Sequence, residues 1–591
     1  MSPSSLSPEI HPSQSRLYSS SRDSSYPSSS FWNQSNSKMD DVGSLKPISL
    51  NDHQGLKSRV TIQSHNESEE PEDPDFTLVL PSNRLYIVIP GLMLCIFLAA
   101  LDQTIITTAI PTIEKSFDDS SSYSWIGTAY SLAETAVLPL AGIMSEVVGR
   151  KAVLYSSTVI FLLGSALCGA AKSMIWLILC RAVQGIGGGG IMSLVTIVIA
   201  DITPLQTRSY YTGCFGATWG IASVMGPLMG GAISQKTTWR WIFFINLPTG
   251  GIALTTLIFF LNLIPKPRTS FSQFMKTFDF LGIITITVGV VLFLLGLSLG
   301  STAGVWTHAN ILCYLIIGIL CLVVFAVNET YTKRVKIMPP AAFKTLSLTS
   351  IMVTSFLHYY IMSTITYYIP VYLQDVKGDG PLMSGVHTLS FAVVSSVTSA
   401  ISGFSIGKLR NYTYFMIGGW IILLAGAGSM IAIYHETDIS RVMGFIALTA
   451  IGVGNLFQPN LIALQASVPP ATMATSCSAF MLLRNMGSSI GIAIGAVIYD
   501  QRLSTLLQGM SYDKNISFSQ IQEITDASER NRILDALANA IRMIWIVNVP
   551  FAALGAILSF FTKQNKLSQS VMAYDENKEG INQDRQEMEK P

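Results

Sequence analysis

Three ionisable residues of this chain lie inside long apolar stretches, where charged groups are rare. Asp102 and Glu134 are carboxylic acids, and Arg181 is a cation. A charge deep in a bilayer is costly, so such a group faces protein or water and is paired with another group. The chemistry open to these residues is proton binding or recognition of a charged solute.

The positions of Asp102 and Arg181 along their stretches allow them to meet. Asp102 lies about eight residues before the outer end of the first stretch, and Arg181 about eight residues into the fourth, which enters from outside. At 1.5 Å per residue both would lie roughly 12 Å below one surface. Such a pair would either fix helix packing or take part in coupling and solute contact.

Glu134 and Arg484 lie near the middle of their stretches. Glu134 has no obvious partner in the sequence, and desolvation disfavours its charged form. We therefore expect Glu134 to be a group that binds and releases a proton. For Arg484 the sequence favours a structural role.

Uncharged polar residues form a second set. Asn455, Gln458, Asn460 and Gln465 lie in the twelfth stretch, and Gln184 follows Arg181. Asn455 and Gln458 are three residues apart and share a helix face, so they could line a hydrated path. Interhelical hydrogen bonds are the alternative. Gln184, Asn455, Gln458 and Asn460 are our candidates for the wall of a solute cavity.

The elements that must position these residues are transmembrane helices. Of the 591 residues 49% are hydrophobic and 12% are charged, and the mean hydropathy is +0.45. Apolar blocks of about 20 residues, enough to cross a bilayer, alternate with short polar joints. We expect fourteen spans, over 86–108, 123–145, 152–171, 175–199, 211–234, 240–261, 280–299, 310–328, 347–369, 384–405, 413–434, 441–465, 473–498 and 541–562.

Charge and composition indicate how the chain is oriented. Residues 1–84 are polar and rich in Ser, which is typical of a disordered tail. Alternate loops carry about twice as many Lys and Arg as the others, which places both termini in the cytosol. Residues 499–540 become an outer loop, with an amphipathic helix near its end and Asn515 as a candidate glycosylation site.

Several classes of protein are disfavoured. The GxGxxG pattern in residues 185–190 lies inside a span with no preceding strand, and residues 403–408 do not form a P-loop. The seven cysteines are scattered and favour buried side chains rather than disulfides or zinc. A net charge of +1 gives no footprint for nucleic acid. We expect no metal, no cofactor and no enzymatic nucleophile.

Five motifs resemble those of the major facilitator superfamily, and in particular its fungal fourteen-helix drug:proton antiporter branch. The motif of the first helix is similar to residues 101–111, that of the fourth to residues 181–185, and the signature of the sixth to residues 239–248. The superfamily loop motif resembles residues 142–151. In that loop Glu146 replaces the usual Asp and Val147 a basic residue, so its charge latch is expected to be weakened.

The resemblance assigns conformational roles to glycines and loop residues. In the loop motif these residues are Gly142, Glu146, Gly149, Arg150 and Lys151. In the fifth span the antiporter motif is represented by Gly213, Gly226, Pro227, Gly230 and Gly231, with Ala222 where Gly is usual. Small residues allow close helix contact and Pro bends a helix, which suits a gate, although a static kinked helix is the alternative.

The resemblance implies an all-α membrane protein of the major facilitator fold. Two six-helix bundles (85–262 and 346–563) would flank two inserted helices (263–345), with cytosolic tails over 1–84 and 564–591. It further implies a monomer that uses a proton gradient to export a small solute or drug by alternating access, with Asp102, Glu134 and Arg181 in coupling. The intramembrane carboxylates favour a cationic solute.

Two alternatives to drug export stay open. Some relatives in this branch are vacuolar carriers of amino acids, chiefly basic ones, so the membrane would be either the plasma membrane or an endomembrane. A non-transporting receptor or scaffold built on the same fold is a second alternative. Apart from membrane lipid and the small solute, no partner is expected.

Overall fold

The computed structural model describes residues 78–117, 124–264, 278–303, 306–334, 336–338, 343, 345–469, 472–508, 521–522, 524, 526–567 and 571–573. The described elements all belong to one unit, Asp73–Pro591. The predicted glycosylation site at Asn515 and the tail up to residue 77 lie outside these residues.

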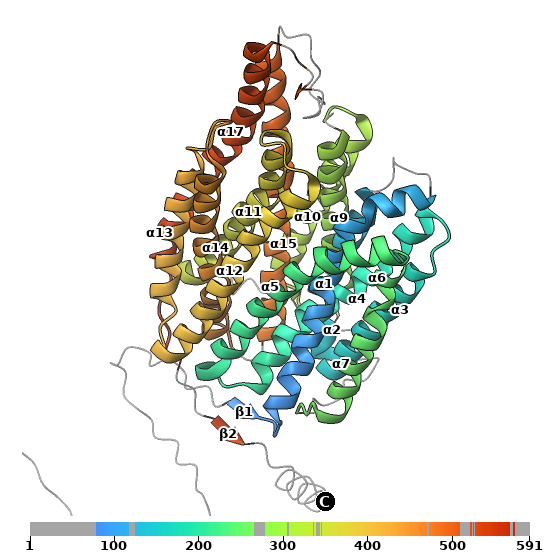
Figure 1. The fold of residues 1–591 in the computed structure, drawn as a ribbon. Helices are drawn as coiled ribbons and strands as arrows, with labels where there is room; N and C mark the ends of the chain where they lie inside the picture. Colours follow the sequence, from blue (N-terminus) through green and yellow to red (C-terminus); the bar gives the residue numbers. More distant parts are fainter. Residues whose placement is uncertain are drawn as a thin grey trace, which may run out of the picture. The chain divides into compact units, whose positions relative to one another are not determined.

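Long helices make up nearly all of the described chain (Figure 1). The first group, here called the N-terminal half, consists of α1 (Leu85–Phe117), α2 (Ser124–Val147), α3 (Arg150–Gly169), α4 (Met174–Ile202), α5 (Leu205–Lys236), α6 (Trp241–Phe244) and α7 (Asn246–Phe260). Two further helices follow, α9 (Phe280–Ala303) and α10 (Ala309–Tyr331). The C-terminal half consists of α11 (Leu346–Asp375), α12 (Pro381–Leu409), α13 (Thr413–Met430), α14 (Ile439–Ser467), α15 (Met473–Leu507) and α17 (Ala527–Ser559).

Thirteen spans of the described chain are long and apolar enough to cross a membrane, with α6 and α7 counted as one. The helix outside this set is α5, which has 32 residues and is therefore long enough. Its glycines and hydroxyl side chains lower its hydropathy. With α5 included, the described helices account for the fourteen spans expected from the sequence.

Two segments differ from their expected form. The sixth span is interrupted at Ile245, so that α7 begins at Asn246. The predicted outer loop 499–540 is largely helical at its edges, because α15 continues to Leu507 and α17 begins at Ala527. The expected amphipathic helix and the last span are thus one continuous helix. Hydropathy locates the membrane-crossing part of a helix but does not mark where the helix itself ends.

Two short strands bring the two ends of the helical unit together. Strand β1 (Leu78–Leu80) precedes α1, and β2 (Val571–Ala573) follows α17, and the two pair in parallel. At the same end of the unit, Asn83 Nδ2 donates to the carbonyl of Asn262 at 2.7 Å. We call this end of the helices the termini face and the opposite end the distal face.

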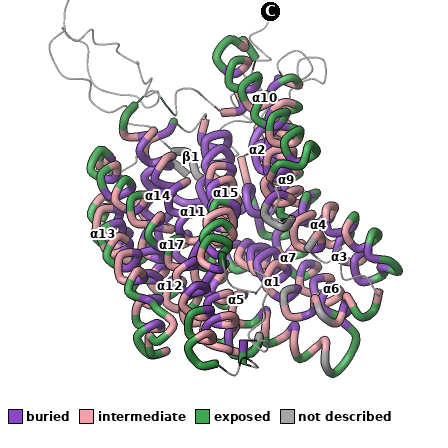
Figure 2. Tube along the Cα trace, turned by 90° about the horizontal axis from the view of Figure 1, so that it is seen from above, coloured by how far each residue is buried: buried purple, intermediate pink, exposed green. Residues whose placement is uncertain are grey.

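Helix α4 is the most enclosed span and α10 the least. In their apolar windows 89% of α4 is buried but only 17% of α10 (Figure 2). Helix α10 packs on α9, which in turn contacts α2 and α15 from the two halves. The exposed apolar side chains of α10, such as Ile316 and Leu320, suit contact with lipid. Cys313 is exposed on this helix, contrary to the buried position expected for all cysteines.

Glycines let α4 contact α2 and α3 at backbone distance. A Cβ on Gly187 would lie 2.3 Å from the backbone nitrogen of Phe161, and one on Gly189 would lie 2.4 Å from the carbonyl oxygen of Glu134. The glycine run in residues 185–190 therefore serves helix packing. This agrees with our rejection of a nucleotide-binding motif.

Close contacts between the two halves lie in the helix segments toward the termini face. A Cβ on Gly403 of α12 would lie 2.8 Å from the Cα of Gly213 on α5. On α2 and α15, Gly142 packs against Ser478, whose hydroxyl lies 2.9 Å from that of Ser193. Farther along the same helices, Asn485 Nδ2 donates to Thr135 Oγ1 at 3.4 Å.

Replacing Gly187 by Ala should destabilise the N-terminal half. The new methyl group would overlap the backbone of Phe161, which cannot rotate away, and overpacking of this kind costs about 1–3 kcal/mol. Gly251→Ala is the matched control, because nothing lies within 4 Å of its Cβ position. Thermal unfolding of the purified variants measures the difference. Equal melting temperatures would contradict the packing described for α4.

Candidate functional site

The buried charges of the N-terminal half meet between α1 and α4. Arg181 Nη1 forms an ion pair with Asp102 Oδ2, and both side chains are almost completely buried, at 1% and 0% exposure. The pairing that their positions along the two spans allow is therefore present. Neither charge is left alone at depth, which is the condition under which a buried ion pair is tolerated.

Three uncharged side chains complete the pair. Gln184 Oε1 accepts from Arg181 at 2.7 Å, while Gln184 Nε2 donates to Asp102 Oδ1 at 2.7 Å and to Ser165 Oγ at 2.6 Å. Asn246 Nδ2 donates to Asp102 Oδ1 at 3.1 Å and to Ser165 Oγ at 3.0 Å. Helices α1, α3, α4 and α7 thus share one hydrogen-bonded cluster, here called the Asp102 cluster.

Arg181 has further contacts outside this cluster. Its Nε donates to the carbonyl of Ile126 at 3.1 Å, which adds the start of α2. Its guanidinium carbon lies 4.4 Å from the ring centroid of Tyr130 and 5.9 Å from that of Phe243. Aromatic faces favour a cation at such distances. Arg181 is therefore held in place from several sides.

Glu134 is a buried carboxylic acid in a very different setting. Its side chain is on α2, is 8% exposed and accepts a hydrogen bond from Gln103 Nε2 at 3.1 Å. Among the described residues no ion pair involves it. Of the two predicted carboxylates, Asp102 is committed to a cation and Glu134 is not.

The polar residues of α14 bond to neighbouring helices. Asn455 Nδ2 donates to the carbonyl of Phe415 on α13 at 2.7 Å, and Gln458 Nε2 donates to Ser399 Oγ on α12 at 3.0 Å. These are interhelical hydrogen bonds, the alternative that the sequence left open. Asn460 is 2% exposed, and neither atom of its amide has a partner among the described residues.

The loop between α2 and α3 holds the expected charged residues. Arg150 forms an ion pair with Glu146, with Nη2 3.0 Å from Oε1, and a second with Asp201 at the end of α4. Gly149 has φ of +102°, a conformation in which other residues are strained. Lys151 is half-buried at the start of α3. Arg150 is thus held by two carboxylates, that of Glu146 within the loop motif and that of Asp201 outside it.

The motif residues of α5 pack mainly against α1. A Cβ on Gly226 would lie 2.1 Å from Thr104 Oγ1, and one on Gly230 would lie 2.4 Å from the carbonyl oxygen of Ile105. Gly231 has open space around it, and Pro227 lies inside the helix. Gly213, in contrast, faces α12 of the other half.

Four site residues were not singled out from the sequence: Gln103, Ser165, Asp201 and Asn246. Gln103 and Asn246 lie inside motifs that the family resemblance already covers. The sequence signal that could have identified both residues is a polar side chain inside a recognised motif. Ser165 offered none, because serine is common in membrane helices and bonds readily to its own helix.

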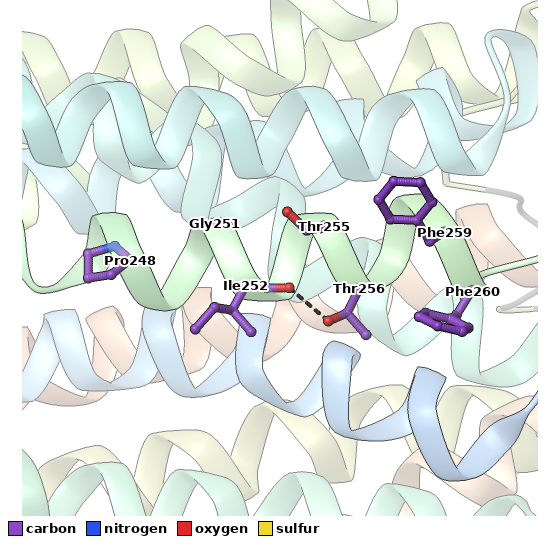
Figure 3. Close-up of a pocket in the computed structure, with 7 residues that line it drawn as sticks. All are labelled: Pro248, Gly251, Ile252, Thr255, Thr256, Phe259 and Phe260. Atoms are coloured by element: carbon purple, nitrogen blue, oxygen red, sulfur yellow. Dashed lines mark hydrogen bonds between the residues drawn. The ribbon is translucent and has the colours of Figure 1, made fainter.

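A shallow hollow on α7 lies on a different surface (Figure 3). It is lined by Pro248, Gly251, Ile252, Thr255, Thr256, Phe259 and Phe260. Ile252 and Phe259 are 62% and 75% exposed. An exposed apolar groove along a single helix suits lipid contact, and it offers no charged group for a solute. In the described part of the chain no cluster of His, Cys, Asp and Glu could hold a metal ion.

Known proteins resemble this chain over most of its length. Residues 92–492 match the family model described as Major Facilitator Superfamily. An uncharacterized MFS-type transporter of Schizosaccharomyces pombe is 74% identical over 527 residues, covering 89% of either chain. The efflux pump dotC of Dothistroma septosporum is 33% identical, covering 83% of this chain and 86% of its own.

Solved structures share the fold at low sequence identity. The human organic anion transporter TETRAN has a TM-score of 0.55 at 13% identity, covering 82% of this chain and all of its own. The proton:xylose symporter XylE gives the same TM-score and identity, covering 82% and 97%. These similarities concern the fold alone.

Replacing Asp102 by Asn should destabilise the protein by about 3–5 kcal/mol, because Arg181 would remain buried without its counter-charge. The double variant Asp102→Asn/Arg181→Gln should lose less than the sum of the two single variants. Thermal unfolding of all four proteins measures this coupling. Additive losses would show that the two side chains do not act as a pair.

Proposed function

Because this chain belongs to the major facilitator superfamily, a family of membrane transporters rather than enzymes, we propose that it is a proton-coupled antiporter. In this proposal it exports a small solute from the cytosol by alternating access of a central site to the two sides of the membrane. The proton gradient supplies the driving force, and no cofactor is needed.

The observation that carries the proposal is the contrast between Glu134 and Asp102. A carboxyl that couples transport to the proton gradient must gain and lose a proton at a small free-energy cost in each conformational state. Asp102 is unsuited, since protonation would break its ion pair with Arg181 and leave a buried cation. Among the described residues, the hydrogen-bond donor to Glu134 is the neutral amide Gln103 Nε2, and both the neutral and the charged form of the carboxyl can accept from it. We therefore assign the proton to Glu134.

Arg181 and the Asp102 cluster then have a supporting role. A fixed positive charge near α2 stabilises the ionised form of a neighbouring carboxylate. Because Tyr130 of α2 packs on Arg181 one helical turn from Glu134, movement of α2 would change that stabilisation. Arg181 thus tunes Glu134 without carrying the proton itself.

The termini face and the distribution of charge support an orientation of the chain in the membrane. Pairing of β1 with β2 brings both ends of the described helical unit to this face. The α2–α3 loop, with Arg150 and Lys151, lies on the same face, and basic loops favour the cytosol. We therefore assign the termini face to the cytosolic side.

Alternating access fits the placement of the contacts between the halves. Gly142 packs on Ser478, and Gly213 on Gly403, in the helix segments toward the termini face. These contacts close the path from that face while they last, so we assign this arrangement to the state that is open to the distal side. Their separation would open the cytosolic path.

Export is supported by relatives that are named efflux pumps, of which dotC is one. Glu134, when ionised, attracts a cationic group of the solute electrostatically. Binding of this group and binding of a proton then compete for the same carboxylate. This competition couples movement of the proton in one direction to movement of the solute in the other.

Glu134→Gln should abolish pH-driven transport without unfolding the protein, because the amide mimics the protonated acid and cannot release a proton. The measurement is accumulation of labelled lysine, arginine, histidine and a cationic dye in acidified proteoliposomes. Accumulation should fall to the level seen without a gradient, and solute exchange at equal pH should weaken as well, because the amide carries no charge to attract the cationic group.

Glu436→Gln is the matched control, because the Glu436 side chain is 84% exposed. It should leave transport unchanged. If Glu134→Gln kept full pH-driven accumulation, the proton would not reside on Glu134. If none of the probes responded to a gradient in the unmodified protein, the proposal of proton-coupled export would be wrong for these solutes.

A further inference from the structure

The two buried arginines at the centre of the halves differ in what balances their charge. Arg181 is paired with Asp102. Arg484 on α15 is only 6% exposed, yet no ion pair joins it to a carboxylate in the part of the chain that the structure describes. A buried charge without a counter-charge is costly, so Arg484 needs another explanation.

Aromatic side chains surround the Arg484 guanidinium. Its carbon lies 4.0 Å from the ring centroid of Tyr359 on α11, 5.6 Å from that of Phe457 on α14 and 5.3 Å from that of Phe480 on α15. We call these three rings the aromatic cage. The rings favour the cation and fix its position, but they carry no net charge.

The hydrogen bonds of Arg484 leave part of its donor fork unused. Nη2 donates to the Tyr359 hydroxyl, and Nη1 contacts the Met481 sulfur at 3.8 Å. A guanidinium has five N–H donors, and no bond from Nε is present among the described residues. Unlike the enclosed donors of Arg208, none of the Arg484 nitrogens is a fully buried atom without a partner. The remaining donors are thus not completely enclosed by the described residues.

Neutral polar groups lie on the side of α14 that carries Phe457 of the aromatic cage. The carbonyl of Val453 accepts from His358 Nε2 at 2.9 Å, and the His358 ring packs on Phe457 at 5.0 Å. Asn460 shares this helix face with Phe457 by its spacing of three residues, and its buried amide has no partner within the described ranges. Neither side chain supplies the missing negative charge.

Arg484 and Glu134 lie at matching levels on the two halves. The residue after Glu134, Thr135, accepts a hydrogen bond from Asn485, the residue after Arg484, at 3.4 Å. The side chains of Glu134 and Arg484 turn away from this contact, toward α1 and α11 respectively. One uncompensated anion and one uncompensated cation therefore flank the junction of α2 and α15.

We propose that Arg484 and its aromatic cage form a subsite that receives a carboxylate of the transported solute. A planar carboxylate matches the fork of a guanidinium and would supply the missing counter-charge. This inference rests on the proposed transport function and adds a negative group to the solute. A solute with both charges meets Glu134 in one half and Arg484 in the other.

The test compares benzoate with benzamide, its neutral analogue, as probes of the purified full-length protein. Benzoate should raise the apparent melting temperature by a few degrees more than benzamide at equal concentration and ionic strength, since a ligand bound to the folded state stabilises it. Arg484→Gln should abolish the difference. Arg484→Lys, which keeps the charge but loses the fork, should reduce it.

Arg441→Gln is the matched control, because Arg441 is an exposed arginine of α14 and should leave the difference unchanged. The proposal is overturned if benzoate and benzamide act alike on the unmodified protein, or if the difference survives Arg484→Gln. If Arg484→Gln does not fold, an unreduced difference in Arg484→Lys overturns it. A benzoate effect that depends on Arg484 without any pH-driven transport would uphold the subsite and count against the proposed function.

Discussion

The structure depends on the cost of placing charge in a medium that cannot solvate it. In the N-terminal half that cost is offset completely at one point, where Asp102 and Arg181 meet and two amides satisfy the carboxylate. The groups come from α1, α3, α4 and α7, so helix association and charge compensation are one event. A half held together in this way suits the rocking-bundle transport that we propose.

Two buried charges, those of Glu134 and Arg484, lack such compensation among the described residues. Glu134 and Arg484 are buried, of opposite sign, and on opposite halves, and each is held by weaker partners than an ion pair. In the proposed mechanism, binding of a proton to Glu134 or of a solute carboxylate to Arg484 reduces this cost. The same physical rule therefore separates the paired charges that hold helices together from the charges that we propose bind a proton or a solute.

Much of this arrangement could be predicted from the sequence, because the bilayer restricts what an apolar stretch can be. Helix positions and the Asp102–Arg181 pair followed from length and depth. Ser165 and Asn246 could not be found in that way, since an uncharged polar residue can bond to its own helix and gives no sign of a distant partner. The aromatic cage was equally hidden, because Phe and Tyr are common in any membrane span.

Helix α4 has a consequence for how such a protein could diversify. Its glycines bring the backbones of three helices into direct contact, with Gly185 on Tyr130 and Gly187 on Phe161, so there is no side-chain slack between them. Close packing of this kind leaves little room for the three helices to shift against one another. Solute specificity can then change through the residues that surround the bound solute, while the closely packed helices stay the same.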